Sequence, residues 1–581
     1  MAKRKRTSRS RTVAATLGSI ARSARGTLQS FTLGALPILD QLLERMKLED
    51  FLRDYLPKER RGTPIATARG LTVLVKNFLL AREPIYGLGE WAAACAPDAL
   101  GLSPEQIRLL NDDRAGRWMT RLFRSDRPSL LLALMAHVVR EFHLGLDELH
   151  NDSTTVTFSG AYTDAAEEQR RGTQKTLMIT WGHNQDHRPD LKQLLYILTV
   201  TSDGGVPVHF RAAHGNVTDD TTHRDTWELL CQLAGRKDFL YVADCKLATI
   251  ENMNYIAKEG RFVSVLPRTR SEDGAFRQRV RQKQVVWQDL WEKTDDAGQV
   301  LDQYSVCSTP EATPEGYRLW WFHSTCKAEL DLAARNRRLQ RAEQELRRWQ
   351  QKLRSPRSRH REPAKVQEAV DEILKDCDAK DLIQVRIEQC AHDTYHQEGR
   401  GRPGKNTVYV KETSLRLDLS YTIDAAAVAR EHLTDGIFPL VTNDLKLSAL
   451  DVLQAYKRQP QIERRFEQLK TDFCLAPVFL KDVGRIEAFL CIYFFALLVE
   501  SLLERELRRA MEREGLEALP LYPEGRDCRR PTTRRLLDLF APVQRHILNH
   551  RSEEPVVLLT ELAPLHRKIL RIIGLPITIY H

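Results

Sequence analysis

Apolar residues recur at helical spacing in the first quarter of the chain. The segments ILDQLLERMKLEDFLRDYL and IATARGLTVLVKNFLLA show this spacing, and Ser103-Pro104-Glu105-Gln106 has the composition of a capped helix start. We therefore expect a helical N-terminal region over residues 27–145. Short helices joined by tight turns suit a helix-turn-helix unit that reads DNA, or a plain packing domain.

The pattern changes to strand spacing near residue 146. Leu149–Phe158 is β-rich, a hairpin is expected around Ser202-Asp203-Gly204-Gly205, and the apolar run Phe239–Ala243 ends at Asp244. With the amphipathic segments between them, the predicted order over 146–270 is β-β-β-α-β-α. This order predicts a mixed α/β fold with a mixed sheet and flanking helices.

The second half of the chain alternates between these patterns. Residues 271–435 combine strands with a long charged helix over 328–353 and a returning helix, which predicts a helical hairpin. A core-type strand, FPLVTND, and further helices are expected over 436–510, and a helical C-terminal region over 511–581.

Composition removes several classes of function. The longest apolar run, Ala488–Val499, has twelve residues and is expected to form a buried core helix, because a membrane span needs about 20. The ten cysteines include no CxxC pair, which is typical of a reduced, cytoplasmic protein. The chain contains no GxxxxGK[ST] loop, so nucleotide hydrolysis is not indicated. It contains no GxSxG elbow, which disfavours a serine hydrolase.

The net charge of +10 is unevenly distributed along the chain. Residues 1–26 contribute +8, residues 335–365 contribute +9, and all other residues together contribute −7. We expect residues 1–26 to form a basic disordered tail. Both segments are predicted to contact nucleic-acid phosphates, although solvated charge is the alternative for each.

Three acids stand out by their positions. Asp152 lies on the apolar face of a predicted strand, Asp244 closes an apolar strand, and Glu463 lies in a cation-rich helical segment. An isolated buried carboxylate is costly, so each must be paired or bind a metal. For any one of them alone, a cap, a turn or an ion pair is the simpler explanation.

The spacing Tyr456-x2-Gln459-x3-Glu463-x6-Lys470 resembles the Tyr-Arg-Glu-Lys signature of insertion-sequence DDE transposases. The resemblance extends to HNDSTTVTFSG around Asp152, HRPDLKQ at 187–193 and YVADCKLAT around Asp244, and it spans about residues 30 to 570. Two positions depart from the family. Gln459 stands where the family has Arg, with Arg458 beside it, and Pro460 falls inside the helical segment. We expect the helix to kink or restart at Pro460.

This resemblance implies a ribonuclease-H-like core in which the strands bearing Asp152 and Asp244 lie side by side. Residues 271–435 would be an insertion domain between the two parts of the core. The family's chemistry implies that Asp152, Asp244 and Glu463 are catalytic and bind two Mg²⁺ or Mn²⁺ ions. It implies DNA contacts by the remaining signature positions, with a homodimer on the DNA ends. These positions are Tyr456, Arg458, Gln459 and Lys470.

Two elements of the expected insertion domain are further candidates for DNA contact. Trp320 and Trp321 would offer a surface for stacking on a flipped base, although at least one of them is expected in the domain core. Arg400 and Arg402 lie in RGRPGK, which resembles a short element that enters A·T minor grooves, or is simply a basic glycine-rich turn.

The leading hypothesis is an active DNA transposase. The principal alternative is a transposase-derived DNA-binding protein with an inactive core. A scaffold built on the helical hairpin would need heptads sustained beyond the four seen over 328–353. Another nuclease of the same fold is disfavoured by the insertion and by the Glu463-x6-Lys470 spacing.

Overall fold

A computed structural model describes residues 26–165, 167–171, 174–295, 298–355, 358, 360, 362–473, 480–550 and 554–580. The expected tail over residues 1–26 lies, apart from its last residue, outside the described residues. The chain divides into two compact units. Unit 1 comprises residues 1–263 and 454–581, and unit 2 comprises residues 264–453.

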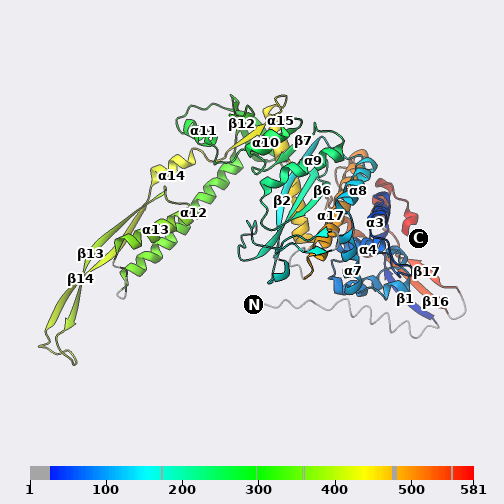
Figure 1. Ribbon diagram of the computed structural model, residues 1–581, viewed down its shortest axis with the longest axis horizontal. Helices are drawn as coiled ribbons and strands as arrows, with labels where there is room; N and C mark the ends of the chain where they lie inside the picture. Colours follow the sequence, from blue (N-terminus) through cyan, green and yellow to red (C-terminus); the bar gives the residue numbers. More distant parts are fainter. Residues whose placement is uncertain are drawn as a thin grey trace. The chain divides into compact units, whose positions relative to one another are not determined.

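The centre of unit 1 is a mixed sheet with the strand order β6-β5-β2-β7-β8 (Figure 1). The strand β2 runs antiparallel to β5 and parallel to β7, and β7 runs parallel to β8. The mixed α/β class expected from the sequence is therefore confirmed. The strands are β2 (Glu148–Phe158), β5 (Lys192–Thr201), β6 (Pro207–Ala213), β7 (Leu240–Ala243) and β8 (Arg261–Val265).

The turn between β5 and β6 is the one predicted at residues 202–205. Gly204 and Gly205 have φ angles of 82° and 61°, a backbone region that favours glycine. The strand β6 leads through the short 3₁₀ helix Asp219–Thr222 into α9 (His223–Ala234), and α10 (Ile250–Ile256) connects β7 to β8. Both are crossover helices, as parallel strands require.

The helix α17 (Val483–Arg513) is the largest apolar element of unit 1. It is long and apolar enough to cross a membrane, but 94% of its most apolar window is buried inside the protein. It packs against β6 and against the N-terminal helices α4 and α7. The expected core helix at 488–499 is therefore confirmed. The helices N-terminal to β2 are α2 (Leu36–Arg45), α3 (Leu48–Tyr55), α4 (Thr67–Leu80), α5 (Leu88–Ala94), α6 (Pro104–Ile107), α7 (Asp112–Arg124) and α8 (Arg127–Glu141).

The predicted helix start at Ser103 has the expected form. The Ser103 hydroxyl accepts from the Gln106 backbone N–H, and the Gln106 side chain accepts from the Ser103 N–H, which together form a capping box at α6.

The two ends of the chain were expected to be wholly helical, and this prediction is wrong. The strand β1 (Gly26–Thr32) pairs with β16 (Gln544–His550), which also pairs with β17 (Val556–Leu559). The strand β1 finds its partner about 500 residues away, so local patterning does not reveal that pairing. Helices α18 (Thr533–Phe540) and α19 (Pro564–Ile572) complete this part of unit 1.

Unit 2 contains a second set of strands in the order β15-β12-β10-β9, with β11 on β12. The helix α12 (Thr325–Arg354) and the returning α13 (Pro363–Asp376) form the predicted helical hairpin. The other elements are α11 (Ser271–Arg281), β9 (Trp287–Thr294), β10 (Val300–Cys307), β11 (Glu311–Ala312), β12 (Arg318–Ser324), α14 (Ala425–His432) and β15 (Ile437–Thr442), and α15 (Ala449–Lys457) runs from unit 2 into unit 1.

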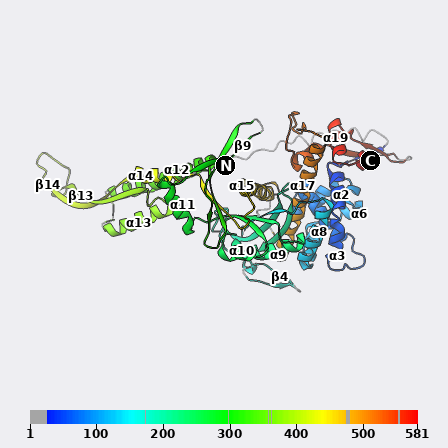
Figure 2. The ribbon, with the colours of Figure 1, turned by 90° about the horizontal axis from the view of Figure 1, so that it is seen from above.

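The most extended feature of unit 2 is a two-stranded ribbon, β13 (Ile383–Gln397) with β14 (Tyr409–Ile423). The sequence predicted β14 but not β13. The base of the ribbon packs on α12 and α13 through a core that includes Leu346, Val370 and Leu419. Its far end extends beyond the helical hairpin in both ribbon views (Figures 1 and 2).

Candidate active site

Asp152 lies within β2, and Asp244 directly follows the adjacent strand β7. In the parallel pair of β2 and β7, Asn151 lies opposite Ala243. Asp152 and Asp244 directly follow these two residues, so they take equivalent places on neighbouring strands. The side-by-side arrangement implied by the family resemblance is therefore present in unit 1.

Glu463 is delivered to the same place by α16 (Pro460–Glu467). Pro460 occupies the first turn of this helix, where its missing N–H costs nothing, and Glu463 lies in the same turn. The chain therefore restarts a helix at Pro460, as the sequence predicted. Glu463 is exposed, and its charge acts on Asp152 and Tyr456.

A buried arginine fixes α16 in position. Arg465 donates to the carbonyl oxygens of Gly204 and Gly205, each at 2.8 Å, and forms an ion pair of 3.0 Å with Glu504 of α17. Because Arg465 lies two residues after Glu463, these contacts attach the helix to the β5–β6 turn and leave Glu463 on the open side.

The carboxylates disfavour one another's ionisation. Burial, followed by the negative charge of Asp244, raises the pKa of Asp152 to about 8. Burial also raises the pKa of Asp244, and the charge of Asp219 adds to it. Carboxylates that raise one another's pKa in this way are typical of a functional site.

Tyr456 lies near the carboxylates, and Lys470 follows Glu463 by seven residues. Burial and then the charges of Asp244 and other acids raise the pKa of Tyr456, so its phenol stays protonated. Lys470 lies in the π-helical turn Gln468–Asp472, and its Nζ is 2.8 Å from Asp186 Oδ1. The lysine therefore has a partner that a DNA phosphate would have to displace.

Arg458 and Gln459 connect the corner between α15 and α16 to β2, next to Asp152. Arg458 forms a bidentate ion pair with Glu148, at 2.6 and 2.5 Å. Gln459 is 6% exposed, with its Oε1 3.2 Å from His150 Nδ1. Their predicted contact with DNA stays a prediction, and a phosphate would have to compete with these protein partners.

The donor set suits a hard divalent cation. Carboxylate oxygens are the ligands that Mg²⁺ and Mn²⁺ prefer, and a cation would offset the mutual repulsion described above. As the side chains stand, no three His, Cys, Asp or Glu residues in the described ranges converge closely enough to hold a metal ion. The residues thus fit such an ion by chemistry and location, while binding would require the carboxylates to draw together.

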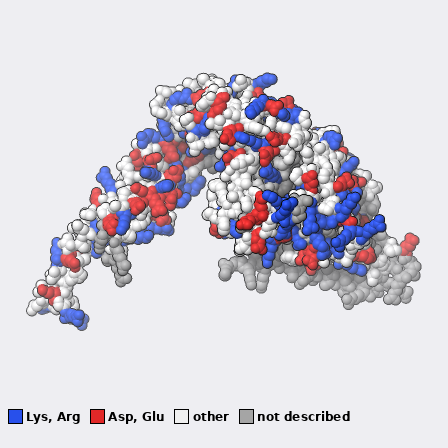
Figure 3. Space-filling view, in the orientation of Figure 1, with Lys and Arg blue, Asp and Glu red and all other residues white. Residues whose placement is uncertain are grey.

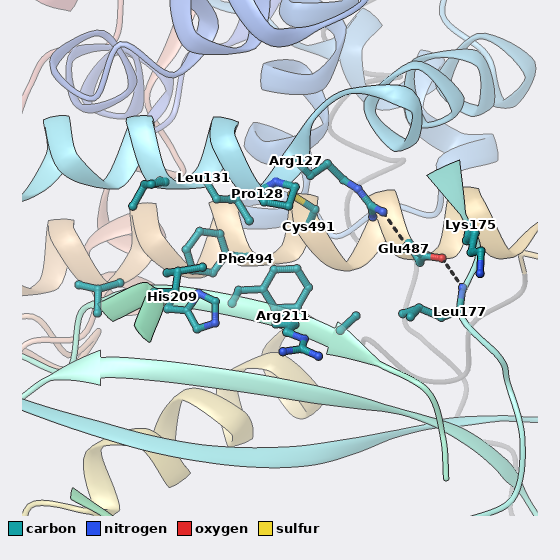
Figure 4. Close-up of a pocket in the computed structure, with 15 residues that line it drawn as sticks. Arg127, Pro128, Leu131, Lys175, Leu177, His209, Arg211, Glu487, Cys491 and Phe494 are labelled. Atoms are coloured by element: carbon teal, nitrogen blue, oxygen red, sulfur yellow. Dashed lines mark hydrogen bonds and ion pairs between the residues drawn. The ribbon is translucent and has the colours of Figure 1, made fainter. Parts of the chain in front are cut away.

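A separate cavity of about 270 Å³ in unit 1 has a different character (Figure 4). Its lining is largely apolar and includes Phe494 of α17. Glu487 is the only acid in that lining. It is paired with Arg127 at 2.8 Å and accepts the Leu177 N–H at 2.8 Å. Asp152, Asp244 and Glu463 do not line this cavity, and Glu463 is exposed to solvent.

Residues 147–499 match the family model described as "Transposase DDE domain". The match covers more than half of the chain and includes every residue from Asp152 to Lys470 discussed above.

The chain belongs to the transposase DDE family.

Other comparisons add little to this assignment. No curated protein matches the transposase significantly. Six solved chains match, among them a piggyBac transposase from a cryo-EM synaptic complex with hairpin DNA. That chain is 8% identical, with a TM-score of 0.30 and coverage of 87% of this chain and 78% of that one. A likeness this weak carries no argument here.

The tryptophan pair of the transposase is divided between core and surface. Trp321 is fully buried, stacks on Phe276 with ring centroids 4.0 Å apart, and donates to Glu311 at 3.2 Å. Its predicted stacking on DNA is wrong, because its faces are covered by protein. Trp320 is half-buried, with Arg318 near its ring, and it keeps a partly open surface.

Arg400 and Arg402 lie at the far end of the β13–β14 ribbon. Both are exposed, and blue Lys and Arg atoms mark this end of the ribbon (Figure 3). Neither forms an ion pair with any described residue. Their predicted DNA contact is compatible with this placement and stays a prediction.

The second basic segment, 335–365, is not a free cationic strip. Arg335, Arg338 and Arg354 pair with acids outside the segment, and Arg348 pairs within it. Counting charges along the sequence hides these partners. Five of the eight described cations over 335–354 thus have acidic partners, and the predicted contact of this segment with DNA phosphates stays a prediction.

The sequence analysis missed Asp219. This residue begins the 3₁₀ turn before α9, and its charge acts on both Asp152 and Asp244. Its only sequence signal is an acid just before a helix, which ordinarily indicates a cap.

Proposed function

We propose that this transposase binds the ends of its insertion sequence, cleaves the DNA strands and joins the 3′-OH ends to target DNA. The observation that carries the proposal is that carboxylates from β2, β7 and α16 lie close enough for the charges of Asp244 and Glu463 to act on Asp152. Asp152 and Asp244 come from adjacent strands, and Glu463 from the first turn of α16. The alternative, an inactive DNA-binding derivative, has no need of such a group of acids.

In this proposal Asp152, Asp244 and Glu463 hold two Mg²⁺ or Mn²⁺ ions. Such a pair of ions polarises the scissile phosphate and stabilises the attacking and leaving oxygens. The chain's own residues orient the substrate. Lys470 exchanges Asp186 for a phosphate as a point charge, and the protonated phenol of Tyr456 donates a hydrogen bond to the backbone.

Other contacts extend the proposed DNA surface. Arg400 and Arg402 at the ribbon end contact the duplex, and Trp320 offers its open edge to a base. A homodimer brings both ends into one complex, and the reaction takes place in the cytoplasm at the nucleoid. The helices over 27–145 contribute DNA contacts from surfaces other than α4, which is nearly all buried.

The decisive experiment measures strand cleavage of duplexes that carry the element's ends, with Mg²⁺ or Mn²⁺. We expect the wild-type protein to cut, and Glu463→Gln to bind the same DNA without cutting. Glu467→Gln is the matched control, because Glu467 is exposed on the same helix one turn later. Wild-type protein that binds ends and never cuts would instead support the inactive derivative.

A further inference from the structure

Asp219 is held at the active edge by a buried serine. The Ser153 hydroxyl donates to Asp219 Oδ1 at 2.6 Å, and Ser153 is 5% exposed. Ser153 directly follows Asp152 on β2, and its backbone N–H donates to Asp152 Oδ1 at 2.8 Å. One strand residue therefore connects the two carboxylates, and a short O–H···O⁻ bond of this kind is charge-assisted.

The backbone of this turn is also fixed. The Thr222 hydroxyl donates to the Asp219 carbonyl oxygen at 2.7 Å, and Thr222 is 2% exposed. The described residues make no other hydrogen bond to the Asp219 carboxylate and no ion pair with it. Its second oxygen is thus left without a protein donor, although the turn that carries it is well anchored.

Asp220, the next residue, provides a contrast. Its charge acts on His223, and its carbonyl oxygen accepts from the Asn252 side chain of α10 at 2.7 Å. Asp219 instead acts on Asp152 and Asp244. Two successive acids with the same local sequence signal therefore have different neighbours: the charge of Asp219 acts on Asp152 and Asp244, and that of Asp220 acts on His223.

We propose that Asp219 is a fourth carboxylate of the active site, which supplies an oxygen donor to the divalent cations and is oriented by Ser153. This inference rests on the proposed function. Each Mg²⁺ or Mn²⁺ ion takes about six oxygen ligands, so two ions need more donors than three carboxylates provide, and water fills the remainder. A fourth acid adds charge where the site must attract cations.

The test measures Mn²⁺ binding to the full-length protein without DNA, from the loss of the free-ion EPR signal. We expect Asp219→Asn to weaken Mn²⁺ affinity by about tenfold, the lower end of the effect of residues that support a metal site. Asp220→Asn is the matched control and should bind within about twofold of wild type. Asp152→Asn should lose most binding and provides the reference.

Two further variants test whether Asp219 donates an oxygen to the cations or only supports the fold of the site. Asp219→Glu keeps the carboxylate and should recover part of the affinity that Asp219→Asn loses. Ser153→Ala keeps all four acids but removes the anchor, and it should give an intermediate loss. Unchanged Mn²⁺ affinity in Asp219→Asn, with binding lost in Asp152→Asn, would overturn the inference. Wild-type protein that binds no Mn²⁺ at all would overturn the proposed metal-dependent function itself.

Discussion

Charge is accommodated in opposite ways at the acidic edge of unit 1, formed by Asp152, Asp244 and Glu463, and on the helix α12 of unit 2. At the edge, Asp152 is surrounded by further acids, which raise its pKa. On α12, Arg335 is almost fully buried yet forms a bidentate pair with Asp435, at 2.8 and 2.7 Å. Although burial opposes it, the hydrogen bond from Arg335 holds the pKa of Asp435 below its usual value.

This difference separates charge that supports the fold from charge that awaits a ligand. A buried ion whose partner is in place is satisfied, whereas like charges that face one another raise the free energy of the folded protein until a counter-ion arrives. Substitutions that remove a charge from the acidic edge of unit 1 or from α12 test this difference.

The largest effect is expected from Asp152→Asn. Losing one ligand carboxylate should lower the rate of strand cleavage by about 10³-fold or more, since several kcal/mol of charge stabilisation are lost and each 1.4 kcal/mol is tenfold. Thermal unfolding without divalent cations should show the variant at least as stable as wild type, because a repelled charge is gone. A marked loss of stability would place Asp152 among the structural acids instead.

Arg335→Ala is the corresponding change on α12. It should lower the free energy of unfolding by about 3–5 kcal/mol in urea titrations, because Asp435 would remain buried without its partner. The control is the double variant Arg335→Met with Asp435→Leu, which removes both charges and should recover most of the loss. A mild effect of Arg335→Ala alone would mean that water reaches this pair.

Gln459→Ala tests the corner that positions α16. It should cost about 1–2 kcal/mol of stability, because buried polar groups of β2 lose a partner, and it should slow cleavage while DNA affinity stays constant. Stability is measured by urea titration and affinity by fluorescence anisotropy, with the exposed Gln344→Ala as the control. Weaker DNA binding at unchanged stability would restore the phosphate-contact interpretation of Gln459.

Two buried histidines predict the response of unit 1 to acid. Burial lowers the pKa of His209 and of His223 to about 4, from an ordinary value near 6.5. Between these values the unfolded chain binds protons that the folded chain does not, so the free energy of unfolding should fall as pH falls from about 6.5 to 4. His223→Gln should flatten this dependence in urea titrations at each pH, whereas the exposed His392→Gln should not.

The smallest effect is expected from Arg348→Ala on the outside of α12. Arg348 pairs only with Glu345, and both side chains are largely exposed, with 58% and 42% of their surface open. Such a pair contributes little, so urea titration should show a change within about 0.5 kcal/mol. A larger loss would mean that exposed and buried pairs of α12 act as one network.

The sequence alone determined the elements with strong local signals. The strands around Asp152 and Asp244, the turn at Gly204 and Gly205, and the apolar helix α17 follow from hydrophobic period and turn chemistry. The restart of a helix at Pro460, with Glu463 in its first turn, follows from the restriction that proline places on the backbone. The candidate catalytic acids could be named from their places in the predicted elements: Asp152 on the apolar face of a strand, Asp244 at the end of a strand and Glu463 in a cation-rich helical segment.

Tertiary structure decided the surroundings of polar and aromatic side chains whose local sequence signals are the same. Trp320 and Trp321 are neighbours, yet Trp321 is fully buried against Phe276 while Trp320 is half-buried. Likewise, the charge of Asp219 acts on Asp152, whereas that of Asp220 acts on His223. Arg335 is a cation among many in the sequence but finds Asp435 a hundred residues later. These outcomes depend on contacts between distant segments, and a side chain's charge or burial is set by its neighbours in space, which local spacing does not specify.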